Sequence, residues 1–137
     1  MANNPAEPLW LTLHDIEDLI SVLKEKHPQQ PVHFGLGGKG KILSALDRPR
    51  NTWLHEGEMN LINLAALYIH AIGKTHALLD GNKRLAFLSG SVFLNRNFVR
   101  LVEPRDGFLG ELVIALMANE MSLQDFQAIL AQHADEI

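Results

Sequence analysis

The feature that most constrains the fold is an apolar stretch at residues 57–75. Apolar side chains recur there every three or four residues, and further leucines occupy the other faces of the same helix. The stripe consists of Met59, Ile62, Ala65, Ala66, Ile69 and Ile72, and the other faces carry Leu61, Leu64 and Leu67. A helix that is apolar on most sides has no face suited to water. The stretch therefore predicts a central helix around which the rest of the chain packs.

Two capping patterns place helices near the two ends of the chain. Thr12 and Asp15 have the spacing of a helix N-cap and its partner, and apolar residues then recur at helical intervals until about residue 26. Ser122 and Asp125 repeat the same spacing before another periodic apolar segment. The sequence therefore predicts one helix before the central stretch and one close to the C-terminus.

The remaining segments complete a helical bundle. A short helix is predicted at residues 42–46, ending before Pro49, because proline disrupts a helix interior. A second apolar helix is predicted at residues 82–97, and another opens at Asp106. Residues 98–102 are apolar and are expected to be extended. Alternating β-branched residues are scarce, so we predict an all-α, compact bundle of about six helices.

The length of 137 residues fits one domain. We expect a flexible leader at residues 1–8 and a single domain at residues 9–137. The N-terminus has no basic segment followed by an apolar one, and no apolar run approaches the roughly 20 residues that span a bilayer. The chain has no cysteine, which excludes disulfides, thiolate metal sites and thiol nucleophiles. These features predict a cytoplasmic protein without a membrane segment.

Charge is distributed unevenly along the chain. The formal net charge is −4, which disfavours a broad nucleic-acid surface, so no direct nucleic-acid binding is expected. Residues 74–105, however, carry six basic side chains against two acidic ones, whereas residues 106–137 carry six acidic side chains and no Lys or Arg. A basic segment inside an acidic chain indicates a small anionic ligand.

The basic segment contains a nine-residue stretch, residues 76–84, that concentrates the chemistry. It reads HALLDGNKR and lies between the two apolar helices. Gly81 permits a close approach of a ligand, and the helix that begins after it has N–H groups without intrahelical partners. Lys83 and Arg84 place two cations at this helix N-terminus, where positive charge opposes the helix dipole. A bound phosphate would remove that conflict.

The other polar residues of the stretch extend this interpretation. Histidine is the side chain suited to act as a general base near neutral pH, which assigns that role to His76. Asp80 is suited to hold Mg²⁺, and Asn82 can bond to a phosphate or to a metal-bound water. Together they indicate phosphoryl or nucleotidyl transfer to a hydroxyl. The alternative is a common Asp-Gly-Asn turn with a solvated Lys-Arg pair and His76 as a helix cap.

The same nine residues resemble the signature of the Fic/Doc family. The general pattern is H-x-F-x-D/E-G-N-x-R, and this chain has H-A-L-L-D-G-N-K-R. The lysine at the eighth position is similar to the Doc, or "death on curing", branch. The glycine-rich loop with the following residues 41–49, and the helices on both sides of the signature, also resemble Doc-like proteins. The resemblance extends over residues 9–133.

The resemblance implies a toxin of a toxin–antitoxin pair. Doc-like members move the γ-phosphate of ATP to a threonine of elongation factor Tu and thereby block translation. By this likeness ATP is the substrate and Mg²⁺ the metal, and a small antitoxin protein binds as a helix in an apolar groove.

The resemblance also assigns roles to individual residues. His76 is the general base, and Asp80 holds magnesium and orients the base or the target. Gly81, Asn82 and Lys83 form an anion cradle, and Arg84 clamps phosphate. The loop at residues 33–41 becomes a flap that holds the target peptide, through Gly35, Gly37, Gly38, Lys39, Gly40 and Lys41.

Three positions depart from the family pattern. Leu78 replaces the buried aromatic residue, and Leu85 stands where Doc-like sequences usually have threonine. Phe87 occupies the place of the second arginine that AMP-transferring members use, which argues against AMP transfer in the usual orientation. Two alternatives stay open: transfer of AMP to a protein hydroxyl, and a catalytically weakened module that only binds nucleotide or a partner.

Two further patterns are present, and we give them little weight. Residues 52–57 fit the S/T-x-x-x-E-G/N pattern of self-inhibited Fic proteins, but the second arginine that its glutamate would pair with is Phe87 here. His70, His76 and Asp80 could suggest a zinc site. A helical spacing of six residues does not place the two histidines on one face.

Overall fold

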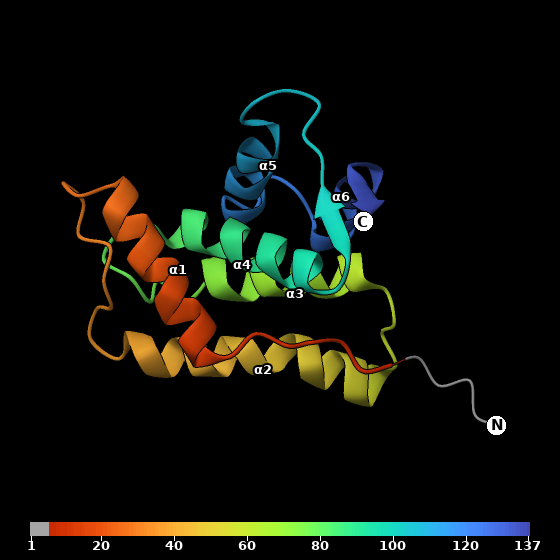
Figure 1. Cartoon of the computed structure of the whole chain (residues 1–137), viewed down its shortest axis with the longest axis horizontal. Helices are drawn as coiled ribbons and strands as arrows, with labels where there is room; N and C mark the ends of the chain where they lie inside the picture. Colours follow the sequence, from red (N-terminus) through yellow and green to blue (C-terminus); the bar gives the residue numbers. More distant parts are fainter. Residues whose placement is uncertain (1–5) are drawn as a thin grey trace.

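A computed structural model of the chain describes residues 6–137, so residues 1–5 of the predicted leader lie outside the described residues. The described part contains six helices and two three-residue strands (Figure 1), which confirms the predicted all-α bundle. The elements are α1 (Leu13–Lys26), α2 (Gly38–Glu56), α3 (Leu61–Gly73), α4 (Asn82–Arg96), β1 (Val99–Leu101), α5 (Phe108–Met117), α6 (Leu123–Gln132) and β2 (Ala134–Glu136). No helix within residues 6–137 has both the length and the apolar content needed to cross a bilayer.

Helix α3 is the central helix that the apolar stretch predicted. It packs against α2, α4, α5 and α6, and in Figure 1 it runs through the middle of the molecule. Every side chain from Leu64 to Ile69 is buried, including positions on opposite faces of the helix. Asn60 caps α3 by accepting hydrogen bonds from the N–H groups of Ile62 and Asn63. The helix is thus enclosed on all sides, as its composition requires.

Helix α2 differs from its prediction at both ends. It begins at Gly38, inside the segment expected to be a loop, and continues through Pro49 to Glu56. Proline at position 49 cannot donate the hydrogen bond to the carbonyl of Ala45, a loss that ordinarily ends or kinks a helix. Pro49 is buried, and α2 packs lengthwise on α3. The tertiary contact therefore keeps α2 helical through a residue that local propensity rejects.

Helix α1 begins with a capping box, and one residue of that box forms an ion pair with α4. Thr12 and Asp15 form the predicted capping box, in which each side chain accepts a hydrogen bond from the backbone of the other. Asp15 also accepts two hydrogen bonds from Arg96, at 2.7 and 3.0 Å. These bonds lower the pKa of Asp15 to about 2, chiefly through the contact with Arg96. The predicted N-terminal helix therefore also anchors the C-terminal end of α4.

The C-terminal part contains a small sheet that the sequence did not predict in full. The extended segment expected at residues 98–102 is β1, and it pairs antiparallel with β2 at the end of the chain. Asp135 and Glu136, at the end of the acidic C-terminal segment, belong to β2. Helix α5 begins at Phe108, two residues after the predicted start, because Gly107 adopts a left-handed backbone at its N-cap.

Candidate functional site

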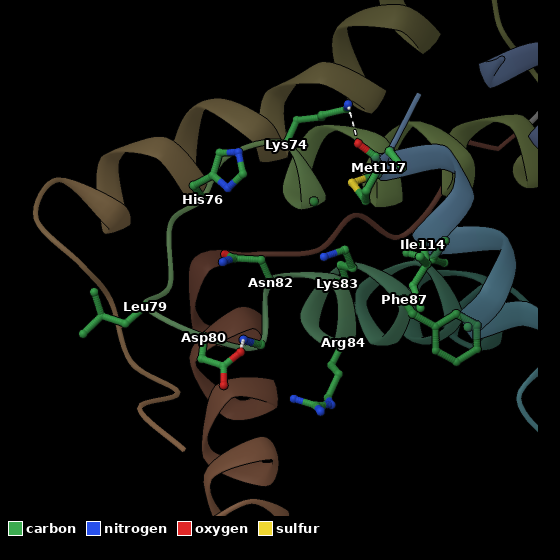
Figure 2. Close-up of a pocket in the computed structure, with 15 residues that line it drawn as sticks. Lys74, His76, Leu79, Asp80, Asn82, Lys83, Arg84, Phe87, Ile114 and Met117 are labelled. Atoms are coloured by element: carbon green, nitrogen blue, oxygen red, sulfur yellow. Dashed lines mark hydrogen bonds between the residues drawn. The ribbon is translucent and has the colours of Figure 1, made fainter. Parts of the chain in front are cut away.

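A cleft of about 660 Å³ opens beside the loop that joins α3 to α4. Its walls are this loop, the first two turns of α4, and one face of α5 (Figure 2). The six predicted signature residues with polar or glycine chemistry all line the cleft: His76, Asp80, Gly81, Asn82, Lys83 and Arg84. The structure therefore brings the whole predicted motif to one cavity, whose size suits a small-molecule ligand.

Asn82 fixes the shape of the loop. Its side-chain oxygen accepts a hydrogen bond from the Leu78 N–H, and its side-chain nitrogen donates one to the Leu78 carbonyl, both at 2.9 Å. Leu78 itself is buried, so it fills the anchor position that the family pattern gives to an aromatic residue. We predicted that the Asn82 amide would meet phosphate or a metal-bound water. In the structure, that amide is already bonded to the backbone of the loop.

A second segment braces the loop from the other side. The N–H of Gly35 donates to the Ala77 carbonyl at 2.9 Å, and the N–H of Leu79 donates to the His33 carbonyl at 3.0 Å. Phe34 and Leu78 thereby form a single antiparallel bridge. The predicted flap loop is shorter than expected, because it covers residues 33–37, whereas Gly38, Lys39, Gly40 and Lys41 form the first turn of α2.

The absence of a side chain at Gly38 explains why the start of α2 can lie so close to the motif loop. A Cβ atom at Gly38 would run into the carbonyl oxygen of Ala77. Only glycine lets the start of α2 lie against the backbone of the motif loop. At Gly40, by contrast, a Cβ would meet no atom within 4 Å. Packing therefore requires glycine at position 38 but not at position 40.

The N-terminus of α4 forms the floor of the cleft's polar end. Gly81 is the N-cap residue, with a left-handed φ of 92°, and no side chain among residues 6–137 caps the helix. The N–H groups of the first turn therefore have no capping side chain within residues 6–137, and such an end is suited to bind an anion. Lys83 is exposed at this turn, and Arg84 reaches across to donate a hydrogen bond to Gln30 at 2.8 Å. The two cations are thus held apart, one on each side of the helix start.

His76 and Asp80 lie on the loop beside this helix start. His76 is exposed and has a left-handed φ of 50°, unusual for a residue with a side chain. Its ring lies above Asn82 and Lys83 at the upper edge of the cleft in Figure 2. One carboxylate oxygen of Asp80 accepts the Gly81 N–H at 2.7 Å, which leaves the other oxygen without a hydrogen bond among residues 6–137. A single free carboxylate oxygen fits Mg²⁺, which takes most of its ligands from phosphate and water.

The opposite end of the cleft is apolar, and we did not predict it. Helix α5 and its C-cap line it with residues at helical spacing, and Phe87 adds an aromatic ring from α4. The residues from this helix are Gly110, Val113, Ile114 and Met117, followed by the C-cap residue Ala118. Leu109 and Leu116, on the other face of this helix, are buried in the core. The second stripe was visible in the sequence, but nothing local linked it to a motif 30 residues earlier.

Lys74 connects the two ends of the cleft. Its ammonium group donates hydrogen bonds to the Met117 carbonyl at 3.0 Å and to the Asn119 side chain at 2.8 Å. The first of these bonds is drawn in Figure 2. The residue after α3 is therefore tied to the end of α5. This tie sets the separation between the motif loop and the apolar face.

Neither the inhibitory pattern nor the zinc trio forms a site at the cleft, because Glu56 and His70 do not line it. Glu56 is the last residue of α2, whereas Gly38 at the other end lies against the motif loop. At 1.5 Å per residue the two ends are roughly 27 Å apart. The ring nitrogen Nδ1 of His70 accepts a hydrogen bond from the guanidinium of Arg48 at 2.8 Å. Burial, together with the nearby charges of Arg48 and Lys74, lowers the pKa of His70. Among residues 6–137 no three His, Asp or Glu side chains cluster as metal ligands.

Known proteins are similar in sequence to the part of the chain that contains the motif. The sequence model of the Fic/DOC family matches residues 10–94, which include the loop and nearly all of α4. The chain is also 27% identical over 89 residues to "Protein kinase doc" of Escherichia phage P1, and this match covers 65% of the chain and 69% of the phage protein. Helix α5, which carries the apolar end of the cleft, lies beyond the family match.

Proposed function

The chain belongs to the Fic/DOC family, and we propose that it is a Doc-like toxin that transfers phosphate from ATP to a hydroxyl group of a protein. The observation that supports this proposal most directly is the arrangement at the polar end of the cleft. An exposed histidine lies beside a helix N-terminus that has no side-chain cap and carries two cations. This arrangement suits a reaction in which catalysis consists of positioning and charge stabilisation.

The proposed reaction assigns one task to each side chain. His76 accepts the proton of the target hydroxyl, whose oxygen forms a bond to the γ-phosphorus while the bond between that phosphorus and the β–γ bridging oxygen breaks. ADP leaves with the electron pair of the broken bond. The α4 N–H groups, Lys83 and Arg84 stabilise charge on the phosphates, and Asp80 would hold Mg²⁺, which supplies further charge neutralisation. Asn82 keeps the loop in shape through its two bonds to Leu78.

The segment at residues 33–37 is the proposed flap for the target peptide. Its inner edge is paired with residues 77–79. The N–H and C=O groups of Phe34 have no hydrogen-bond partner within residues 6–137, and Leu36 is fully exposed beside them. An extended target peptide could add to this free edge, which would bring its hydroxyl side chain towards His76.

ATP labelled separately at the α and γ positions tests the reaction. We expect γ label, and no α label, to appear in a protein target, and we expect His76→Ala to remove at least about 99% of the transfer. His14→Ala is the matched control, because His14 is an exposed histidine on α1 that does not line the cleft. Transfer of α label would establish AMP transfer instead. Binding of ATP without any transfer would establish the weakened module.

A cellular experiment tests the toxin role. We propose that the protein acts in the cytoplasm on elongation factor Tu, by resemblance to Doc-like proteins, and that a small antitoxin restrains it by docking a helix in an apolar groove. Expression of the wild-type chain alone should arrest growth, and His76→Ala should not. Normal growth at high wild-type expression would contradict this role.

A further inference from the structure

The cleft has two chemically different ends within one cavity. The polar end offers backbone N–H groups, Lys83 and Arg84, which suit phosphates. The apolar end offers a stripe of α5 and the ring of Phe87, and Figure 2 shows Phe87 and Ile114 on the side of the cleft away from His76 and Asp80. A nucleoside triphosphate has the same division, with charge at one end and a flat aromatic base at the other.

The apolar end contains little that could distinguish one base from another. The residues that line it from α5 and its C-cap carry no hydrogen-bonding side chain: they are Gly110, Val113, Ile114, Met117 and the C-cap residue Ala118. Lys74 also lines the cleft beside Met117, and two of its three ammonium hydrogens are already donated to Met117 and Asn119. Discrimination between bases requires polar groups that are left unpaired by the wrong base. The described lining of this end does not supply them.

The apolar face is also partly accessible, although Val113 belongs to the core and Met117 packs against it. Ile114 is 53% exposed, although its neighbours Val113 and Leu116 are buried. Gly110 leaves open space, since a Cβ there would meet no atom within 4 Å. The face continues directly into the proposed phosphate site, so a molecule bound at the polar end would reach it without leaving the cavity.

From these observations we infer that the apolar face of α5 and Phe87 form a nucleobase subsite that recognises a purine by shape and stacking, so that the enzyme accepts ATP and GTP alike. This inference rests on the proposed function, because it assumes that phosphates occupy the α4 N-terminus. It goes further in naming the substrate class as purine nucleoside triphosphates, and in assigning their base to a helix outside the family match.

Equilibrium binding of three ligands to the full chain tests the inference, with Mg²⁺ present: ATP, GTP and inorganic tripolyphosphate. Stacking of one base on apolar and aromatic side chains predicts that ATP binds about tenfold more tightly than tripolyphosphate. We expect the dissociation constants of ATP and GTP to agree within about threefold. Equal binding of ATP and tripolyphosphate would overturn the base subsite but leave the phosphate site intact. A preference for one purine above about tenfold would overturn recognition by shape.

A variant at Gly110 tests the location. Gly110→Leu should fill the apolar end and weaken ATP and GTP binding to about the level of tripolyphosphate, whose own affinity should not change. Gly40→Leu is the matched control, because Gly40 is also a helical glycine with open space at its Cβ, and it does not line the cleft. Unchanged ATP binding in Gly110→Leu would overturn the assignment. If the wild-type chain bound none of the three ligands, the proposed function would fail together with this inference.

Discussion

The two ends of the cleft differ in how the chain builds them. The polar end comes from a single segment, residues 76–84, whose loop is shaped by bonds between Asn82 and Leu78. The apolar end combines Phe87 with residues of α5 that follow it by more than 20 positions. A compact motif places its reactive side chains together by local structure, whereas an assembled surface depends on how distant elements pack and can change without disturbing the motif. We therefore expect the polar end to carry the reaction and bind the phosphates, and the apolar end to bind the base.

The largest effect is expected at the polar end. Lys83→Ala removes an exposed cation beside the α4 N-terminus, and it should lower the rate of phosphate transfer about 100-fold or more. The dissociation constants of this variant for ATP and for tripolyphosphate should rise by equal factors, because in the proposed binding mode the lysine lies beside the phosphates and not beside the base. Lys24→Ala on α1 is the control. A loss of ATP affinity alone would contradict the division between the two ends.

The next largest effect is expected at Gly38, where the start of α2 lies against the motif loop. Gly38→Ala places a methyl group against the Ala77 carbonyl and should lower the free energy of unfolding by about 2–3 kcal/mol. Gly40→Ala, two residues along the same helix, has open space and should raise that free energy by up to about 1 kcal/mol. Urea denaturation measures both. Equal behaviour of the two variants would show that the close contact at Gly38 does not matter.

Phe87→Arg would convert part of the apolar end into a polar one. The new guanidinium adds a cation to the cleft, so tripolyphosphate should bind about tenfold more tightly. The advantage of ATP over tripolyphosphate should shrink, because the aromatic ring is lost. Phe98→Arg, at an exposed position outside the cleft, should change neither affinity. An unchanged ratio of the two affinities would show that Phe87 does not contact the base.

The smallest effect is expected for the ion pair between Asp15 and Arg96, which lies outside the cleft. Asp15 has a pKa of about 2 in the folded protein, below its ordinary value of 3.8, because Arg96 stabilises the carboxylate. Its contribution is therefore complete above about pH 5 and is lost as the pH falls towards 2. Asp15→Asn should lower the free energy of unfolding by about 1 kcal/mol at neutral pH. Between pH 4 and pH 2 the wild-type chain should lose stability more steeply than this variant. Parallel profiles would contradict the role of the pair.

Much of the fold was predictable because local patterns and tertiary packing agree. Thr12 and Ser122 cap helices where their spacing predicted, and the residues of α3 from Leu64 to Ile69 are buried on every face. The exceptions have physical causes. Pro49 remains inside α2 because the helix packs lengthwise on α3, and β2 forms because β1 provides a partner for it. Such contacts join residues far apart in the sequence, so no local pattern records them.

The sequence by itself determined the helical class, the central helix and the residues that meet at the polar end, because periodicity and a contiguous motif are local properties. Only the tertiary structure decided what those residues do within the site. In the tertiary structure Asn82 bonds to the backbone of the loop, the segment predicted as a flap ends at Gly37, and Glu56 lies far from the cleft. The same structure also brings α5 opposite Phe87. These outcomes depend on how helices pack in three dimensions, where a side chain's partners are set by distance in space and not by position along the chain.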